Sequence, residues 1–387
     1  MFFRFYHTED FMDNSFSKDD TWIAKAVALI FMFMHHLWWF PERLCGGELK
    51  HWIDLSTGES LPEFLGCVGK ICVSMFFFLG GYGIYMSSKN KPFDLVKRLK
   101  KLYVSYWKIF LVLVPIGIIF FSNQEDYCAQ SFRCHVFEDA NSKYVILGFL
   151  GVSDKFDGNW WFFFSYVVAV ITFPLVRKIV ERHTFAVNLA IVVVCGILMN
   201  NVFPALGSNS AYGLMKSNSL YSTFFMQDSP FIACFWMGVI VAKDDILVRL
   251  KASLRENDLF HMWFMIFLIV AGVCLRRWKF GAFLDLFSVP VLCVAFAYVF
   301  GYFRLVKTLF VEIGKKSMAM WLIHGFFCFH VHPLAWFITR PRYALPCLLL
   351  LLLCSYVTAV VIELLWRAIG IVYKKVDNTI KKRGAIQ

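Results

Sequence analysis

The chain has 387 residues, of which 59% are hydrophobic and 19% aromatic, and it contains 44 phenylalanines. Its mean hydropathy of +0.61 is spread over successive long apolar runs, which excludes a single soluble core and indicates a polytopic helical membrane protein. The formal net charge of +12 does not require nucleic acid as a partner, because most of the lysines and arginines cluster in the segments between the apolar runs.

The apolar runs predict an all-α bundle of about ten transmembrane helices, since about 20 residues are needed to cross the hydrocarbon core. The predicted spans are residues 22–40, 66–88, 103–121, 159–176, 184–203, 223–242, 260–275, 281–303, 317–338 and 344–368. Ten spans place both termini on one side together with most of the basic loops. The positive-inside rule makes that side cytosolic.

The predicted organisation is simple. Residues 1–21 form a cytosolic N-terminal segment, residues 22–370 form one transmembrane domain, and residues 371–387 form a basic cytosolic tail. The first apolar run is not followed by a small-residue cleavage site, so we expect the first span to stay in the mature chain. The expected location is the cell membrane, which the chain crosses many times.

Three ionisable side chains lie within the first span, namely Lys25, His35 and His36. Lys25 and His36 are eleven residues apart, or about three turns, which places them on one helix face about 16 Å apart. Ionisable groups inside a hydrophobic span are costly, and by default they mark a functional site that faces the bundle interior or a water-filled cavity. The alternative is that Lys25 extends to the cytosolic interface and the histidines are hydrogen-bonded core residues.

The second span ends in a glycine-rich segment, and a basic segment follows it. Gly80, Gly81 and Gly83 are expected to let a neighbouring helix approach closely. Arg98 and Lys101 are three residues apart at the start of the next helix, so they are neighbours on one face and could hold phosphate groups. The alternative is that both only mark the cytosolic side.

The long polar connection from Ser122 to Gly158 is predicted to be on the outer side, and it contains Cys128 and Cys134. These two cysteines form a disulfide if that face is oxidising, and otherwise they are free thiols or core-facing residues. His330 and His332 have no carboxylate or thiolate at ligand spacing, so no metal site is predicted.

Five segments occur in an order that points to one family. They are Lys25 to His36, Met75 to Gly83, Arg98 to Trp107, Asn159 to Phe162, and Ser317 to His324. In this order and at these topological positions they resemble acyltransferase family 3, whose pattern in the first span is a basic residue, ten residues and a histidine. The resemblance covers essentially the whole chain. The departures are lysines at 25 and 101, where arginine is more usual, glycine at 80 in place of serine, and valine at 104 in place of proline.

The resemblance implies that the transmembrane domain is an integral-membrane O-acyltransferase. It implies transfer of an acyl group, most often acetyl, from cytosolic acyl-CoA to a hydroxyl of an extracytoplasmic or membrane-linked polysaccharide of the cell envelope. Acetyl-CoA would then be the co-substrate, with no metal. The expected partners are a glycan acceptor, membrane lipids and proteins of polysaccharide biosynthesis, including those for exopolysaccharides.

Acyl transfer needs a base for the hydroxyl, a place for the anionic donor and stabilisation of the oxyanion. His36 suits the role of base, because an imidazole can accept a proton near neutral pH. Lys25 would then guide the thioester or its pantetheine arm, and Arg98 and Lys101 would hold the phosphates of coenzyme A. No serine or cysteine nucleophile stands out beside His36, which favours direct transfer.

His35, Trp161 and His324 are further candidates. His324 lies midway along the ninth predicted span and is expected to hydrogen-bond within the bundle rather than to touch the substrate. Trp161 is at a predicted interface, where tryptophans are common, although a sugar can stack on such a ring.

Two other functions fit part of the pattern. A transporter or flippase of a glycan or a lipid-linked precursor would share the spans and basic loops, but it gives no reason for the Lys25–His36 spacing. An acyltransferase that acts on a lipid or a peptide would share all the motifs, so the acceptor is left open.

Overall fold

The computed structural model describes residues 16–130, 133–138, 140–198, 229–254, 258–278 and 281–384. Within these residues the chain is helical and has no β-strand, which confirms the predicted all-α class. The end of the predicted span 184–203 and the start of the span 223–242 lie outside the described residues.

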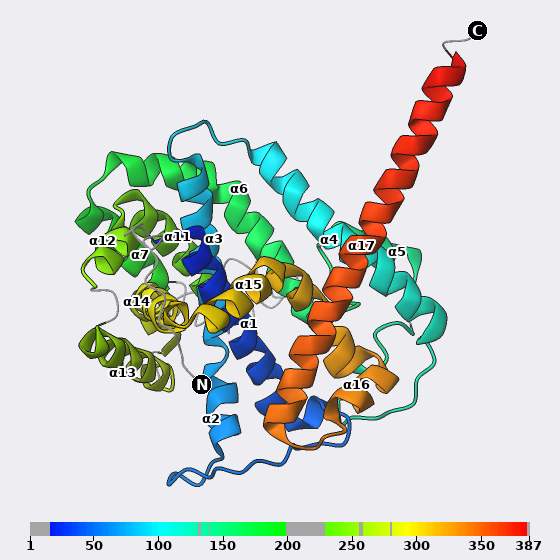
Figure 1. Cartoon of the computed structure of the whole chain (residues 1–387), viewed down its shortest axis with the longest axis horizontal. Coiled ribbons are helices and arrows are strands. Elements are labelled where there is room, and N and C mark those ends of the chain that lie inside the picture. The colour runs from blue at the N-terminus through cyan, green and yellow to red at the C-terminus, as the bar shows by residue number, and fades with distance from the viewer. Residues whose placement is uncertain are drawn as a thin grey trace, which may run out of the picture.

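Figure 1 shows the helices in chain order, from blue at the N-terminus to red at the C-terminus. Their bounds are α1 (Lys18–Trp38), η2 (Pro41–Arg43), α2 (Leu61–Val68), α3 (Ile71–Ser88), α4 (Leu95–Phe120), α5 (Ser142–Phe149), η4 (Gly158–Trp160), α6 (Trp161–Arg182), α7 (Phe185–Ile197), α11 (Ser229–Lys243), α12 (Ile246–Ala252), α13 (Leu259–Leu275), α14 (Gly281–Tyr302), α15 (Arg304–Gly325), η8 (Phe326–His330), α16 (His332–Thr339) and α17 (Ala344–Gly384).

Six helical segments of the described chain are long and apolar enough to cross a membrane, and one bent pair would make seven. Three shorter apolar helices, Phe185–Ile197, Phe231–Lys243 and Leu259–Leu275, fall in other predicted spans. Each of the ten predicted spans therefore overlaps an apolar helix. How many of them cross the membrane, and on which side the termini lie, stay predictions.

The ninth predicted span, residues 317–338, is not one straight helix. The helix begins earlier, at Arg304, and continues through the π-helical segment Phe326–His330 before the chain turns by 92° into α16. π-Helical segments are frequent at functional sites.

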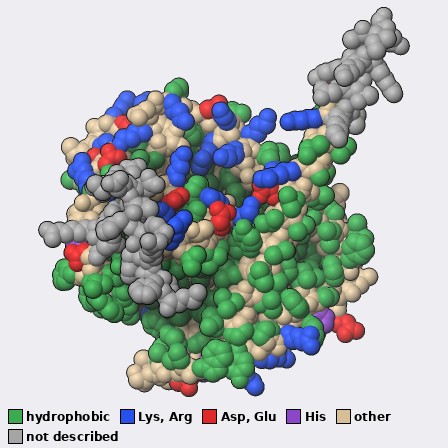
Figure 2. Space-filling model, in the orientation of Figure 1, with side chains coloured by type: hydrophobic (Ala, Val, Ile, Leu, Met, Phe, Trp, Pro, Cys, Tyr) green, Lys and Arg blue, Asp and Glu red, His purple; other side chains and the backbone are tan. Residues whose placement is uncertain are grey.

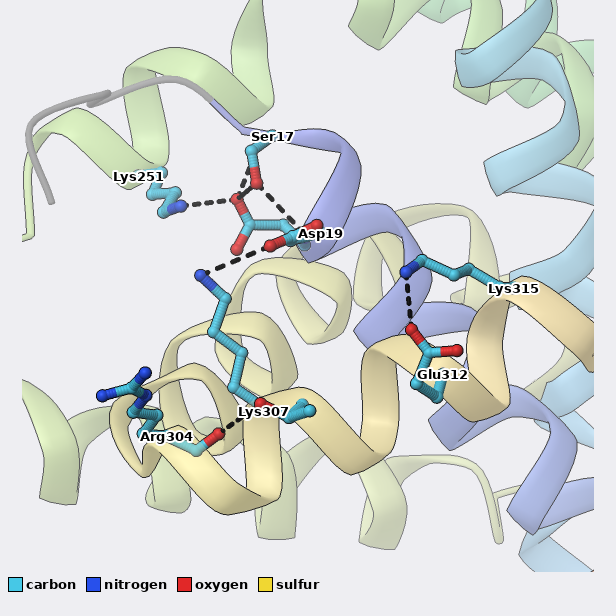
Figure 3. Close-up of polar contacts among 9 residues, drawn as sticks. Ser17, Asp19, Lys251, Arg304, Lys307, Glu312 and Lys315 are labelled. Atoms are coloured by element: carbon cyan, nitrogen blue, oxygen red, sulfur yellow. Dashed lines mark hydrogen bonds and ion pairs between the residues drawn. The ribbon is translucent and has the colours of Figure 1, made fainter. Parts of the chain in front are cut away.

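The first helix, α1, lies at the centre and packs against α2, α3, α14, α15 and α17 (Figure 1). It begins with a capping box, in which Ser17 and Asp20 each accept a hydrogen bond from the other's backbone N–H. Asp20 also pairs with Lys251 of α12, and Asp19 lies 3.5 Å from Lys307 of α15 (Figure 3). These contacts hold the rotation and height of α1 relative to its neighbours.

The surface separates apolar from basic side chains. In the view of Figure 2, Lys and Arg gather along the upper edge, and hydrophobic side chains cover much of the lower right part. On α17 the exposed residues Leu349, Leu353, Val357 and Val361 recur every fourth position and form one apolar stripe. Such a stripe without protein cover is the pattern of a helix that faces lipid.

Helices α3 and α11 cross at glycines. A Cβ atom at Gly81 would lie 2.0 Å from the carbonyl oxygen of Phe235, and one at Gly238 would lie 2.1 Å from that of Phe78. The backbones can approach this closely only without a side chain. The close approach expected from the sequence is therefore confirmed at Gly81, whereas a Cβ at Gly83 would meet no atom within 4 Å.

Alanine at Gly81 is predicted to destabilise the fold, because its methyl group would collide with backbone rather than with a side chain that can move. We expect Gly81→Ala to lower the free energy of unfolding by about 1–3 kcal/mol. Gly83→Ala is the matched control and should be neutral or stabilising by about 0.5–1 kcal/mol. Melting temperatures of the two purified variants in detergent test this, and equal melting temperatures would contradict it.

Candidate active site

A cavity of about 670 Å³ lies alongside α1 and is bordered by residues of α3, α4, α6, α15 and α17. Six of the candidates predicted from the sequence line it: Lys25, His35, His36, Arg98, Lys101 and Trp161. Lys25 and His36, which the sequence places on one face of α1, both line this cavity. His324 lies outside the lining, directly behind His36.

The cavity is strongly basic toward the N-terminal end of α1. Arg98 and Lys101 lie in the first turns of α4, and their positive charges repel that of Lys25. Lys315 and Lys316 of α15 also line the cavity, and they pair with Glu312 and Glu363. Several like charges around one cavity are favourable only when an anion or water screens them, so this end suits a polyanionic ligand.

His36 lies at the other end of the cavity and is partly accessible from it. Its Nδ1 atom is buried and has no hydrogen-bond partner among the described residues. The centre of its ring lies 5.0 Å from that of His324, a fully buried residue whose ring also stacks on Phe33. The ring of His36 is therefore confined on one side and accessible on the other.

The hydrogen bonding of His324 decides which of its ring nitrogens faces His36. Its Nδ1–H donates to the carbonyl oxygen of Trp321, so in the neutral ring Nε2 carries the lone pair. That Nε2 atom is buried and, like Nδ1 of His36, lacks a partner within the described part of the chain. Each of the two adjacent imidazoles thus has one buried ring nitrogen without a hydrogen-bond partner among the described residues.

His35 and Trp161 also have well-defined surroundings. Nδ1–H of His35 donates to the carbonyl oxygen of Gly66 at 2.8 Å, which holds its ring against α2. Trp161 opens α6 and borders the cavity, whereas its neighbour Trp160 is buried and donates from Nε1 to the carbonyl oxygen of Leu322. Of the two tryptophans, only Trp161 is placed to stack on a ligand in the cavity.

A buried acid–imidazole pair, which the sequence did not predict, lies near His324. Nε2 of His330 is 3.2 Å from Oδ1 of Asp157, and both side chains are fully buried. Nδ1–H of His330 already donates to the carbonyl oxygen of Arg133, so a charged pair requires the doubly protonated ring. Asp157 Oδ1 also accepts hydrogen bonds from the backbone N–H and Nδ2 of Asn159, at 2.9 and 2.7 Å.

The Asp157 carboxylate packs directly against α15. A Cβ atom at Gly325 would lie 2.1 Å from its Oδ2 atom, so glycine is required there. The charge of Asp157 also acts on His324, which connects the buried pair to the ring behind His36.

Comparison with protein-family models supplies the identity. The Acyl_transf_3 model, described as an acyltransferase domain, matches residues 22–362, nearly the whole chain. The chain belongs to acyltransferase family 3. Comparisons with curated proteins and with solved structures found no match. The resemblance drawn from the motifs is confirmed, and the protein is a multi-pass membrane acyltransferase.

Sequence reasoning missed several residues of this acyltransferase cavity. Arg43, Lys70 and Arg133 line it toward the His36 end, and none of them belongs to a motif. The only sequence signal for Asp157 was its place two residues before Asn159, in a segment that resembled the family. Its partner His330 comes from the far end of the chain, so no local pattern connects the two.

The cysteines and possible metal ligands of the acyltransferase add little to the site. Cys128 and Cys134 are free thiols with their sulfur atoms 3.1 Å apart, compared with about 2.05 Å in a disulfide. Whether they are bridged in an oxidising environment stays a prediction. The described residues include no group of three or more histidine, cysteine, aspartate or glutamate side chains that could hold a metal ion.

Removing Asp157 is predicted to destabilise the acyltransferase strongly, because it leaves the buried imidazole of His330 without its neighbouring carboxylate and two Asn159 donors without their acceptor. We expect Asp157→Ala to cost about 3–5 kcal/mol, as is typical when one partner of a buried pair is removed. Asp126→Ala is the matched control, since Asp126 pairs with His135 at 2.9 Å on the surface and should contribute about 1 kcal/mol or less. Thermal unfolding of both variants measures the difference, and similar melting temperatures would refute it.

Proposed function

We propose that this acyltransferase moves an acetyl group from acetyl-CoA to a hydroxyl of an extracytoplasmic or membrane-linked polysaccharide. The observation that carries the proposal is the single cavity, which has Lys25, Arg98 and Lys101 toward one end and His36 at the other. Coenzyme A has its phosphates at one end of a long pantetheine arm and its thioester at the other. The three turns of helix between Lys25 and His36 span about 16 Å, a distance comparable with the extended arm.

In this proposal the donor enters from the basic end, which faces the cytosol. Arg98 and Lys101 bind the phosphates, and Lys25 guides the pantetheine arm or the thioester carbonyl. Trp161 is available for the acceptor sugar to stack on from the cavity wall. The outer loops carry the acceptor to the His36 end.

His36 is the general base of the proposed reaction. The neutral tautomer that carries its proton on Nδ1 leaves the lone pair of His36 on Nε2. That nitrogen takes the proton from the acceptor hydroxyl while the hydroxyl oxygen attacks the thioester carbonyl. The C–O bond forms, the C–S bond breaks, and the thiolate of coenzyme A takes the proton back from His36. Transfer is direct, and within the described chain no hydrogen bond joins His36 to a serine or cysteine.

Replacing His36 is predicted to abolish transfer, because no base remains for the hydroxyl. In a deletion strain, the parent protein should restore acetyl esters on the surface polysaccharide, and a membrane-inserted His36→Ala variant should not. The loss should be at least a hundredfold in rate, the range attributed to general acid–base catalysis. His261→Ala, a substitution far from the cavity, should behave like the parent.

Other results of the same experiment would point elsewhere. Full activity of His36→Ala would make His36 a structural residue. A deletion that leaves the esters unchanged but alters the amount of exported polysaccharide would indicate a transporter. Acetyl esters on a purified lipid or peptide, and not on the polysaccharide, would show that the enzyme catalyses the same transfer to a different acceptor.

Donor binding gives a separate prediction. Arg98→Gln/Lys101→Gln removes two cations that line the cavity, so KM for acetyl-CoA should rise at least tenfold, since each hydrogen bond to a charged group contributes about 1.5–3 kcal/mol. The matched control is Lys97→Gln/Lys100→Gln, which removes the same charge from the same turns of α4 but not from the lining. Steady-state kinetics should show a normal KM for the control. Equal rises in KM in the two variants would mean that the total positive charge of α4, and not binding by Arg98 and Lys101, sets the affinity for acetyl-CoA.

A further inference from the structure

A second group of cations lines the cavity at the His36 end. Arg43 ends η2, directly after α1, and Arg133 comes from the connection between α4 and α5. The positive charges of Arg43 and Arg133 act electrostatically on His36, whereas those of Arg98 and Lys101 act on Lys25. The cavity therefore has two separate basic ends, and the proposed donor accounts for only one of them.

Arg43 and Arg133 share one uncharged acceptor. The Nε–H groups of both guanidinium groups donate to Oε1 of Gln130, each at 3.2 Å. Gln130 in turn donates from Nε2 to Glu42, whose carboxylate lies 3.7 Å from Nε of Arg43. The amide oxygen of Gln130 thus holds the two guanidinium groups close together at the end of the cavity by accepting the Nε–H of each.

Aromatic rings and the buried pair hold the two arginines in place. The guanidinium of Arg43 lies 3.3 Å from the ring centre of Phe40, and that of Arg133 lies 5.2 Å from that of Phe329. The backbone carbonyl of Arg133 accepts from His330, which the pairing with Asp157 fixes. The geometry is therefore set before any ligand binds, which lowers the entropic cost of binding one.

The described carboxylates that act on the two arginines lie outside the cavity lining. The described lining residues include one carboxylate, that of Glu363, and it pairs with Lys316 at the other end of the cavity. Burial, followed by the charge of Arg133, lowers the pKa of Arg43 to about 10, so Arg43 keeps its charge at neutral pH. Burial also lowers the pKa of Arg133, against the opposing charges of Asp157, Cys128, Glu42 and Asp154. Asp157 and Glu42 are already held by His330 and Gln130.

We propose that Arg43 and Arg133 bind an anionic group of the acyl acceptor, which makes the acceptor an acidic glycan that carries a carboxylate or a phosphate. The inference rests on the proposed function and adds the chemical class of the acceptor. Guanidinium groups match both anions with paired N–H donors. An anion held at this end places a hydroxyl of the same or the next sugar beside His36, while the donor phosphates lie about three turns of α1 away.

The test uses membranes that contain the full-length protein, radiolabelled acetyl-CoA, and envelope glycans of the deletion strain separated by anion exchange. The parent should label the acidic fraction and not the neutral one. Chemical reduction of carboxyl groups, or removal of phosphate, should lower the labelling at least tenfold, and the treatment that does so identifies the anion.

Variants test the two residues directly. Arg43→Gln and Arg133→Gln should each raise KM for the acidic fraction at least tenfold with a much smaller change in kcat, and Arg43→Lys should recover part of the affinity. Arg340→Gln is the control, because Arg340 lies over Trp336 and outside the cavity lining. The treated glycans probe the same site with the unaltered protein, so a variant that fails to insert does not decide the outcome.

Two failures are distinguishable. Equal labelling of neutral, reduced and untreated glycans, with unchanged KM in the arginine variants, would overturn the anionic acceptor and leave the transferase intact. No labelling of any fraction by the parent, or labelling that persists in His36→Ala, would overturn the proposed function and this inference with it.

Discussion

The structure depends on the cost of placing charge inside a hydrophobic bundle. Lys25 and His36 lie on the central helix, where an ionisable side chain is tolerated only beside water, an opposite charge or a hydrogen-bond partner. The bundle meets this requirement with one cavity rather than with an ion pair for each residue. The capping box and the salt bridges at the start of α1 then matter for function, because they set the rotation that points both side chains into that cavity.

The kinds of side chain that line the cavity differ along its length. Cations gather at both ends, and imidazoles lie toward the end where the first helix stops. Behind the imidazole of His36 the packing is polar, with His324, Asp157 and His330 in succession and all three side chains fully buried. In such surroundings electrostatic interactions are stronger than in water, and a partly satisfied network is costly. This polar cluster is therefore best understood as the support that positions the groups facing the cavity.

The bend after α15 shows how the fold adds residues that a simple ten-helix scheme does not expect. The chain turns by 92° directly after η8, and His330, the last residue of η8, is fully buried beside Asp157. The η8 backbone is also bound to the connection between α4 and α5, whose Tyr127 and Gln124 donate to the carbonyl oxygens of Phe329 and His330. The loop that carries Arg133 is thereby attached to the helix behind the active site.

The sequence by itself determined the helical class, the apolar segments, the family, and the alignment of Lys25 with His36. The helical class and the apolar segments follow from hydropathy, the alignment from the 3.6-residue period of one helix, and the family from five short motifs in order along the chain. None of these needs knowledge of which segments pack together. Only the tertiary structure decided that Asp157 meets His330, that His324 lies behind His36, and that Gln130 joins Arg43 to Arg133. These contacts join segments far apart in the chain through loops and a bent helix, whose geometry depends on packing rather than on any local pattern.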